Sequence, residues 1–235
     1  MTQFFYSDHV FDETIVLPED EAHHALKVLR KYKGDKIIAV DGEGGWYETI
    51  LETDNIQNCK LKIMDRKAEF GKPNHYIHIA MAPPKNHDRA EMFVEKAVEI
   101  GIQEISFILT RYSERNNINL NRIKRRAVSS MKQSLKAYLP QINDILSLDD
   151  FLDKCSNSEK YLGYLRDENT NLLSKSAKPD NNYCVLIGPE GDFMLEEVDL
   201  ALNCDFQTIS LGKSRLRTET AGIAACHILN IINEK

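Results

Sequence analysis

The chain has 235 residues, of which 42% are hydrophobic and 28% charged, and its formal net charge at pH 7 is −6. This composition is typical of a globular protein of one or two domains, and the sequence shows neither a signal peptide nor an apolar run long enough to span a membrane. The five cysteines lie far apart and form no C-x-x-C, which predicts free thiols in the cytoplasm rather than a disulfide framework or a zinc ribbon.

The first 70 residues are predicted to form a small β-barrel domain. Short segments with alternating or buried apolar character indicate strands over 13–17, 36–40, 46–51 and 60–64. One helix is expected over 19–29, because Ala22, Ala25, Leu26 and Leu29 recur at helical spacing. Glycine and proline in 70–74 indicate a linker after this domain.

From residue 74 to 235 the pattern changes to alternating strands and helices. Strands are expected over 76–81, 105–109, 160–164, 183–187 and 206–211, and helices over 88–100, 120–139, 195–202 and 218–232. Gly101 is expected to end the first of these helices and Pro140 the second. Such alternation predicts an α/β domain with a mostly parallel sheet that helices cover on both faces.

Two loops that follow buried strands are candidate ligand sites. The first is Ile-Gly-Pro-Glu-Gly at 187–191, and the second is Leu-Gly-Lys-Ser-Arg-Leu-Arg-Thr-Glu-Thr-Ala at 211–221. In open α/β sheets ligands bind at the carboxyl ends of strands, and glycines let the backbone approach them closely. Thr218 is predicted to be the N-cap of the last helix. Neither loop matches a dinucleotide or P-loop motif, and an ordinary turn or tight core packing explains either loop alone.

Positive charge is concentrated in two segments of an otherwise acidic chain. Residues 111–139 contain eight bases and one acid, and 27–36 contain five bases. Such segments can bind phosphates, although a solvated helix face would carry the same charges.

The two loops together resemble the cofactor end of the SPOUT methyltransferases, and most closely the ribosomal small-subunit methyltransferase E family. Three more segments resemble that family in order along the chain: 23–35, 85–101 and 125–140. The chain departs from the family at Asp192, Met131 and Lys136, where the family often has other residues. The resemblance implies a PUA-like β-barrel over 1–70 and, over 74–235, a SPOUT domain with a deep trefoil knot.

The resemblance further implies an S-adenosylmethionine-dependent enzyme that methylates N3 of a uridine in 16S ribosomal RNA within the small subunit, and that works as a homodimer. The site residues that it implies fall into three groups. Cofactor binding is expected from Leu186, Ile187, Gly188, Pro189, Glu190, Gly191, Ile209, Leu211, Gly212, Leu216 and Thr218; catalysis from Arg217, Arg115 and Arg111; and RNA binding from Lys27, Arg30, Arg122, Arg125, Arg126 and Lys132. Glu190 is expected to orient Arg217 or a backbone amide.

Two other functions are compatible with the same motifs. One is a non-catalytic RNA-binding or ribosome assembly factor, and the other is a SPOUT methyltransferase that acts on another nucleoside or on transfer RNA. No metal is expected, because the pairs His23–His24 and His87–Asp88 lack partners at ligand spacing.

Overall fold

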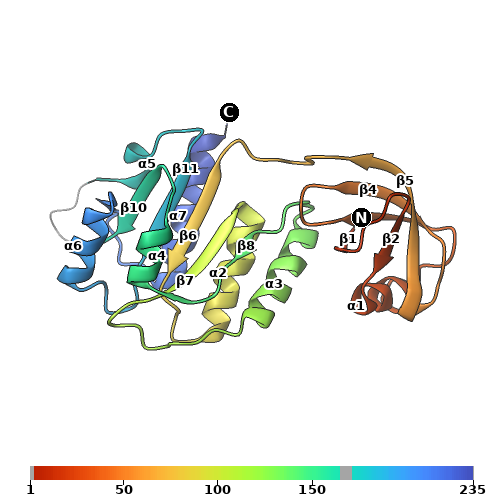
Figure 1. The fold of residues 1–235 in the computed structure, drawn as a ribbon, viewed down its shortest axis with the longest axis horizontal. Coiled ribbons are helices and arrows are strands. Elements are labelled where there is room, and N and C mark those ends of the chain that lie inside the picture. Colours follow the sequence, from red (N-terminus) through yellow and green to blue (C-terminus); the bar gives the residue numbers. More distant parts are fainter. Residues whose placement is uncertain (1–2, 165–170, 235) are drawn as a thin grey trace. The chain divides into compact units, whose positions relative to one another are not determined.

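The computed structural model describes residues 3–164 and 171–234 of the chain. It contains two compact units, one formed by Met1–Lys72 with Val128–Leu139 and the other by Pro73–Ala127 with Pro140–Lys235 (Figure 1). The chain therefore leaves the first unit after Lys72 and contributes a second segment to it later in the sequence.

The first unit is built on a five-stranded sheet with the order β1-β3-β4-β5-β2. Its strands are β1 (Phe4–Tyr6), β2 (Thr14–Leu17), β3 (Lys36–Val40), β4 (Trp46–Leu51) and β5 (Cys59–Lys67). All pairs are antiparallel except β1 with β3. The core includes Phe5, Ile15, Leu51 and Leu61, which are at most 2% exposed. The prediction of a mostly β domain is confirmed, although the short strand β1 was not predicted.

The single helix predicted over 19–29 is two elements, so that prediction is wrong in detail. An α-helix, α1 (Glu19–His23), continues into a π-helix, η1 (His24–Val28). The Leu29 amide donates to the His24 carbonyl at 3.0 Å, which is the i to i+5 bond of a π turn. Arg30 follows with a φ of 55°, in the left-handed region. The π segment is only five residues long, so its different period left no recognisable apolar pattern.

The second unit contains a parallel sheet with the order β12-β10-β11-β6-β7-β8, in which β9 also pairs with β7. The strands are β6 (Tyr76–Met81), β7 (Glu104–Leu109), β8 (Gln141–Ile142), β9 (Leu146–Ser147), β10 (Glu159–Gly163), β11 (Asn182–Ile187) and β12 (Gln207–Ile209). Every strand pair described in this sheet is parallel, as predicted. The short strands β8 and β9 were not predicted.

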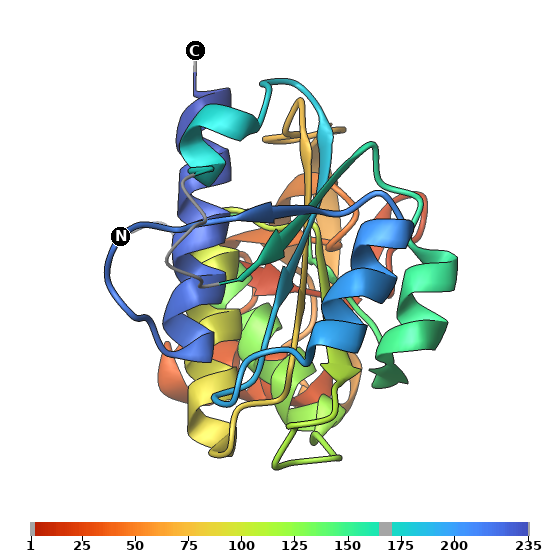
Figure 2. The ribbon, with the colours of Figure 1, turned by 90° about the vertical axis from the view of Figure 1, so that its left-hand side faces the viewer.

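Helices cover both faces of this sheet. The helices α2 (His87–Ile100) and α7 (Thr218–Asn233) pack together on one face, and α4 (Leu148–Lys154) and α6 (Leu195–Asn203) lie on the other (Figure 2). A short helix, α5 (Leu173–Ser176), precedes β11. Gly101 ends α2 with a φ of 132°, as predicted. The order of strands and helices places the carboxyl ends of β10, β11 and β12 side by side.

The long basic helix, α3 (Leu120–Gln133), is shorter than predicted. It ends at a Schellman motif in which Leu135 has a φ of 55°, the Lys136 amide donates to Met131, and the Leu135 amide donates to Lys132. The expectation that Pro140 ends this helix is therefore wrong. Leucine in the left-handed conformation is uncommon, so no local pattern predicts the end of the helix at this position.

Candidate active site

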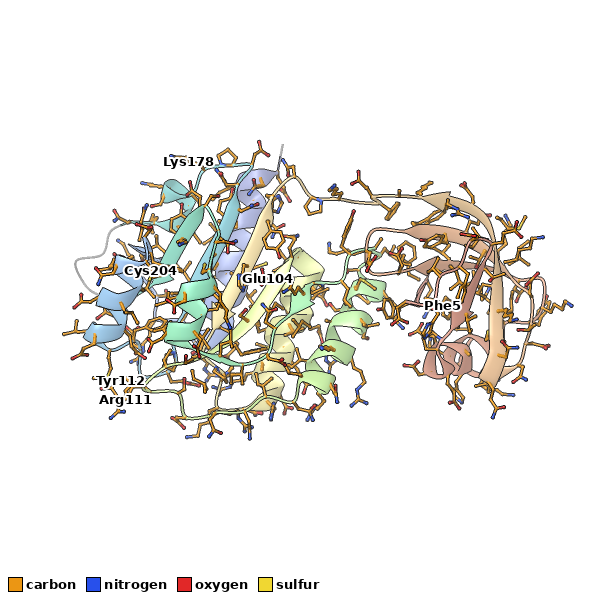
Figure 3. The ribbon with its side chains drawn as sticks, viewed as in Figure 1. Phe5, Glu104, Arg111, Tyr112, Lys178 and Cys204 are labelled. Atoms are coloured by element: carbon orange, nitrogen blue, oxygen red, sulfur yellow. The ribbon has the colours of Figure 1, made fainter. Side chains whose placement is uncertain are left out.

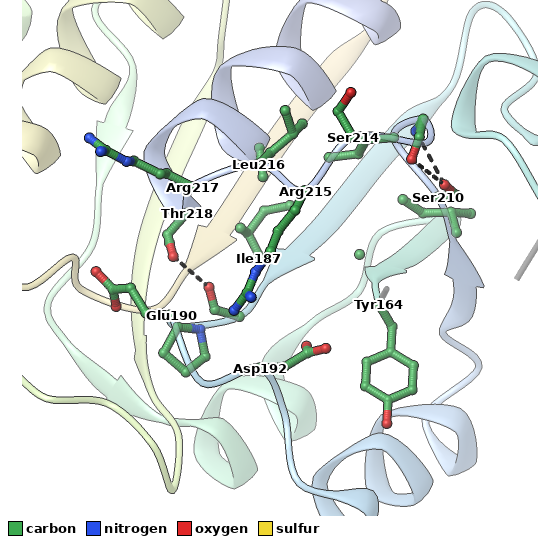
Figure 4. Close-up of a pocket in the computed structure, with 17 residues that line it drawn as sticks. Tyr164, Ile187, Glu190, Asp192, Ser210, Ser214, Arg215, Leu216, Arg217 and Thr218 are labelled. Atoms are coloured by element: carbon green, nitrogen blue, oxygen red, sulfur yellow. Dashed lines mark hydrogen bonds between the residues drawn. The ribbon is translucent and has the colours of Figure 1, made fainter. Parts of the chain in front are cut away.

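A cavity of about 600 Å³ opens at the carboxyl ends of three neighbouring strands. It is lined by residues that follow β10, β11 and β12, so three loops distant in the sequence meet there (Figure 4). The lining consists of Gly163, Tyr164, Ile187, Gly188, Pro189, Glu190, Asp192, Ile209, Ser210, Leu211, Gly212, Ser214, Arg215, Leu216, Arg217, Thr218 and Ala221. The cavity has the volume of a typical small-molecule site.

The loop after β11 forms a tight turn in which the Asp192 amide donates to the Pro189 carbonyl at 3.0 Å. Asp192 has a φ of 64°, a conformation that Asp tolerates better than most residues but that glycine adopts without strain. This explains how Asp can occupy a position where the resembling family often has glycine. A Cβ on Gly188 would lie 2.9 Å from the Phe193 ring, so the close approach at this position requires glycine.

The loop after β12 leads into α7 and is joined to the loop after β11 by one hydrogen bond. The Thr218 hydroxyl donates to the Gly188 carbonyl at 3.0 Å. Thr218 is the first residue of α7, and Arg217 is its N-cap, without a side-chain cap bond. The prediction of Thr218 as N-cap is therefore wrong, because its hydroxyl connects the two loops instead. Gly212 has a φ of 126°, which bends the chain at the cavity.

Residues at the end of β12 run between two parts of a single connection. On one side the Tyr164 amide donates to the Ile209 carbonyl, and on the other the Ser210 amide donates to Asn171 while Leu173 donates to Ser210. Tyr164 and Asn171 both belong to the connection from β10 to β11. The end of β12 is therefore hydrogen-bonded on both sides to described residues of this connection.

One arginine and two carboxylates meet at the rim of the cavity. Arg89, in the first turn of α2, has its Nη1 3.9 Å from Glu190 Oε1 and its Nε 3.7 Å from Glu219 Oε1. The Lys85 amide also donates to Glu190 Oε1 at 3.4 Å. Glu190 Oε2 and Glu219 Oε2 are buried and have no hydrogen-bond partner among the described residues. Of the two contacts expected for Glu190, the one with Arg217 is absent from the described interactions, whereas a backbone amide, that of Lys85, does contact it; Glu190 also faces Arg89.

The structure distributes the predicted cofactor and catalytic residues over three locations. Most of the predicted cofactor residues and Arg217 line the cavity, whereas Leu186 is buried in the core and Gly191 faces Tyr112. Arg111 lies on the loop after β7 beside Tyr112, and the Arg115 guanidinium donates to the Lys85 carbonyl at 3.2 and 3.1 Å (Figure 3).

Sequence reasoning missed several lining residues. Asp192 and Arg215 belong to the two recognised loops, and their positions there were the signal that could have identified them. Tyr164 follows β10, where only the strand pairing reveals its position at the cavity. In Figure 4 the Arg215 guanidinium is directed toward the loop after β11, whereas Arg217 is directed away from it.

Three of the predicted RNA-binding bases are ion-paired within their own unit. Arg122 lies 2.6 Å from Glu91, and Arg126 lies 3.3 Å from Glu91 and 3.1 Å from Glu95. Lys132 pairs with the buried Glu21.

Three other predicted bases have no ion pair in the described part of the chain. Arg125 donates only to the Asn121 carbonyl of its own helix, and Lys27 and Arg30 are exposed in the first unit. Met131 is fully buried, so its departure from the family concerns the core rather than the RNA surface.

Metal ligands and membrane spans were also sought within the described residues. No group of three or more His, Cys, Asp or Glu in residues 3–164 and 171–234 could hold a metal ion. In the same ranges, none of the helices combines the length and the apolar character that crossing a membrane requires. All five cysteines are free.

Comparison with known families and proteins covers nearly the whole chain. Residues 72–230 match an RNA methyltransferase domain, and residues 17–64 match the PUA domain of RNA methyltransferases. The chain is 32% identical over 172 residues to ribosomal RNA small subunit methyltransferase E of Mesomycoplasma hyopneumoniae, covering 70% of this chain and 73% of that protein. It is 24% identical over 210 residues to the protein of the same name from Rickettsia conorii, covering 88% and 85%.

Solved structures agree with this relationship. A probable rRNA methyltransferase from Porphyromonas gingivalis superposes with a TM-score of 0.91 at 36% identity, over 98% of both chains. Ribosomal RNA small subunit methyltransferase E from Neisseria gonorrhoeae, bound to S-adenosyl methionine, superposes with a TM-score of 0.85 at 24% identity over 99% of this chain and 98% of that one. These likenesses confirm the predicted fold class, a SPOUT-type α/β domain with an N-terminal PUA-like β domain.

Proposed function

The chain belongs to the ribosomal RNA small subunit methyltransferase E family, and from this premise we propose that it transfers a methyl group from S-adenosylmethionine to N3 of a uridine in 16S ribosomal RNA of the small subunit. The observation that carries this proposal is the cavity at the ends of β10, β11 and β12, which the family's two recognised loops line. The relative from Neisseria gonorrhoeae, of the same fold, was solved with S-adenosyl methionine.

The residues of the cavity fit the methyl donor. Its volume of about 600 Å³ suits a molecule of that size, and its lining combines apolar side chains such as Ile187 and Leu216 with polar ones such as Asp192 and Ser210. Residues 211–216 lie outside helices and strands, so their backbone groups can be directed at a ligand. A Cβ at Gly188 would meet the buried Phe193 ring, so glycine lets this loop pack closely on the core beneath the cavity.

The bound donor supplies an electrophilic methyl group, and the protein positions the acceptor. N3 lies on the pairing edge of uracil, so the target uridine has to be unpaired or flipped out of a helix. Arg217, Arg111 and Arg115 remain our candidates for cations near the reacting base, and a cation there stabilises the charge that develops as the N3 proton leaves. Holding the two reactants in line supplies a large part of the rate enhancement.

Contacts with RNA are proposed for both units. Lys27 and Arg30 present charge from the first unit, and Arg125 presents charge from α3. Arg122, Arg126 and Lys132 can contribute to the field, but their ion pairs reduce the charge that they offer to phosphates. We further propose that the domains comprise residues 1–70 and 74–235, that the protein is a homodimer, and that it acts in the cytoplasm on the small subunit.

The decisive experiment is methyl transfer from labelled S-adenosylmethionine to small ribosomal subunits that lack N3-methyluridine, with free 16S RNA and transfer RNA beside them. Label recovered as N3-methyluridine from the subunit supports the proposal. Label recovered as another nucleoside, or from transfer RNA, contradicts the proposed substrate. Absence of label together with absence of donor binding by calorimetry leaves a non-catalytic RNA-binding protein.

A further inference from the structure

We propose that Glu190 is the general base that takes the N3 proton of the target uracil, and that Arg89 binds the uracil oxygen beside it. This inference rests on the proposed function and deepens it, because it assigns to two side chains the recognition of uracil as well as the proton transfer. Glu190 was expected only to orient another group, and Arg89 had no expected role.

The first argument is the unpaired oxygen of Glu190. Its Oε1 faces the Lys85 amide at 3.4 Å and Arg89 at 3.9 Å, but Oε2 is buried without a hydrogen-bond partner in the described part of the chain. A buried carboxylate oxygen that lacks a donor is energetically unfavourable. Glu190 also lines the cavity. A ligand that brings a donor to Oε2 removes this cost, and the uracil N3–H is such a donor.

The second argument is the position of Glu190 between the cavity and the basic rim. Glu190 and Asp192 come from the same turn, but Figure 4 shows them directed to different sides, with Asp192 on the side of Tyr164. On the Glu190 side lie Arg89 and, through its bonds to the Lys85 carbonyl, Arg115. Cations attract the RNA backbone, so the target base enters on the Glu190 side of the cavity.

The third argument is how Arg89 is held. Its Nε faces Glu219, whose side chain is only 3% exposed and whose Oε2 also lacks a hydrogen-bond partner among the described residues. Both Arg89 contacts exceed 3.5 Å, so they are ion pairs without hydrogen bonds, and guanidinium donors remain for a ligand. Glu219 lies in the first turn of α7, where the helix dipole stabilises a carboxylate. Glu219 is therefore a positioning residue for Arg89.

Together the pair complements uracil. The pairing edge of uracil presents an acceptor, a donor and an acceptor, and the pair Glu190–Arg89 presents an acceptor beside a donor. Cytosine has no proton on N3, so it would leave Glu190 Oε2 unpaired and place a lone pair against it. Sites that hydrogen-bond a substrate group discriminate strongly against analogues that lack that group.

The proton and electron movements balance without a further reactant. N3 first gives its proton to Glu190 Oε2, and the electron pair of that N–H bond stays on N3 and then forms the bond to the methyl carbon. The bond from that carbon to sulfur breaks and its electron pair stays on sulfur, so the sulfonium becomes a neutral thioether. Arg89 stabilises the negative charge that develops on the uracil oxygen. The Glu190 carboxylic acid then returns its proton to water.

The test compares wild-type protein with Glu190→Gln, which keeps the shape but cannot take a proton. Glu196→Gln is the matched control, because it removes the same charge from the exposed first turn of α6. Donor affinity is measured by calorimetry, and single-turnover methyl transfer is measured from about pH 6 to about pH 9 on subunits that carry uridine or the more acidic 5-fluorouridine at the target.

We expect Glu190→Gln to lose about 100-fold or more in rate at neutral pH with unchanged donor affinity. The ratio of the wild-type rate to the Glu190→Gln rate should decrease as pH rises. It should also be smaller on 5-fluorouridine than on uridine, because in both cases N3 loses its proton to solvent without a base from the protein. Arg89→Ala should also slow transfer without weakening donor binding, and Arg89→Lys should restore part of the rate. The two Arg89 variants test the proposed roles of Glu190 and Arg89 even where Glu190→Gln folds poorly.

Three results would overturn the inference: a Glu190→Gln rate close to that of wild type, a deficit that does not change with pH, or a loss of donor affinity as large as the loss of rate. The last result would assign Glu190 to the donor's ammonium group instead. In contrast, a wild-type protein that forms no N3-methyluridine would refute the proposed function itself, so the two failures are distinguishable.

Discussion

The parallel sheet of the second unit carries two cavities whose polar groups are organised in opposite ways. The cavity at the carboxyl ends of β10, β11 and β12 is lined by loops, and its rim holds two buried carboxylate oxygens that have no hydrogen-bond partner in the described part of the chain. The other cavity, of about 310 Å³, lies toward the amino ends of β6, β7 and β10 and is lined by His78, Glu104 and Ser106 among others. Of these residues, Glu104 is labelled in Figure 3.

At the amino-end cavity the polar groups satisfy one another. His78 Nε2 lies 2.8 Å from Ser106 Oγ, and His78 Nδ1 lies 3.4 Å from Glu104 Oε2. Glu104 also accepts from Tyr76 at 2.9 Å and from Asn143 at 2.7 Å. The contacts run from Ser106 to His78 to Glu104, as in a nucleophilic triad. However, Ser106 is 1% exposed and its oxygen also accepts from Asn143, so a substrate could not reach it. The comparison contrasts a network whose polar groups bind one another with a candidate site at whose rim two carboxylate oxygens lack hydrogen-bond partners among the described residues.

The largest effect is expected where the loop after β11 is displaced from the core beneath it. Gly188→Val would place its side chain against the Phe193 ring, which already lies 2.9 Å from the position of a Cβ. We expect donor affinity to fall by about 100-fold, equivalent to about 2.7 kcal/mol, with Gly188→Ala intermediate. Calorimetry measures the affinity, and circular dichroism checks the fold. Full donor affinity in Gly188→Val would show that this loop does not shape the site.

Removing the central acceptor of the amino-end network should affect stability but not donor binding. Glu104→Ala leaves Tyr76, Asn143 and His78 without their acceptor, and we expect a loss of about 3 kcal/mol, or roughly 6 to 12 °C in melting temperature. Asp144→Ala, exposed at the same cavity, is the control and should change stability by less than about 0.5 kcal/mol. Loss of donor affinity in Glu104→Ala would mean that the two cavities are coupled.

The same distinction between paired and unpaired groups applies to α3. Arg126 is paired with Glu91 and Glu95, whereas Arg125 contacts only its own helix. We expect Arg125→Ala to lower RNA affinity and to reduce the slope of log affinity against log salt by about 1, and Arg126→Ala to change the slope less. Filter binding at several salt concentrations measures both. Equal slopes for the two variants would show that the ion pairs open when RNA binds.

The smallest effect concerns pH. Burial lowers the pKa of His78 below its ordinary value of 6.5, although the charge of Glu104 opposes this shift. The folded protein therefore resists protonation at His78, and the unfolded chain binds the proton first as pH falls below about 6.5. Stability should decrease as pH is lowered through this range, by at most about 1.4 kcal/mol per pH unit. His78→Gln should lack this component in urea unfolding at different pH values; an unchanged slope would contradict it.

Local patterns allowed much of the fold to be predicted from the sequence. The predicted strands 36–40, 46–51 and 76–81 coincide with β3, β4 and β6, because their apolar runs are bounded by turn residues. The exceptions have physical causes: β1 has only three residues, and the end of α3 depends on a leucine in an unfavourable conformation. Neither feature has a periodic signal.

The candidate site was predictable only in part, for a different reason. The two loops were recognisable as motifs, but Arg89, Glu190 and Glu219 are brought together from positions far apart in the chain. Their contacts depend on how β6, β7 and β11 pair and on where α2 and α7 begin, which no local pattern encodes. The Thr218 hydroxyl was assigned to a helix cap for the same reason, since its partner, Gly188, lies 30 positions away.

The passage of Ile209 and Ser210 between Tyr164 and Asn171–Leu173 has a consequence for biosynthesis. The cavity is completed only by residues up to Ala221, so a nascent chain that has not emerged past α7 has no complete donor site. A fragment that stops before β12 lacks one side of the cavity. A separate peptide of β12 and α7 could not restore it by docking on the surface, because β12 has to enter between Tyr164 and Asn171–Leu173. If this cavity binds the donor as proposed, donor binding requires that the segment up to Ala221 has been synthesised and has reached its place in the fold.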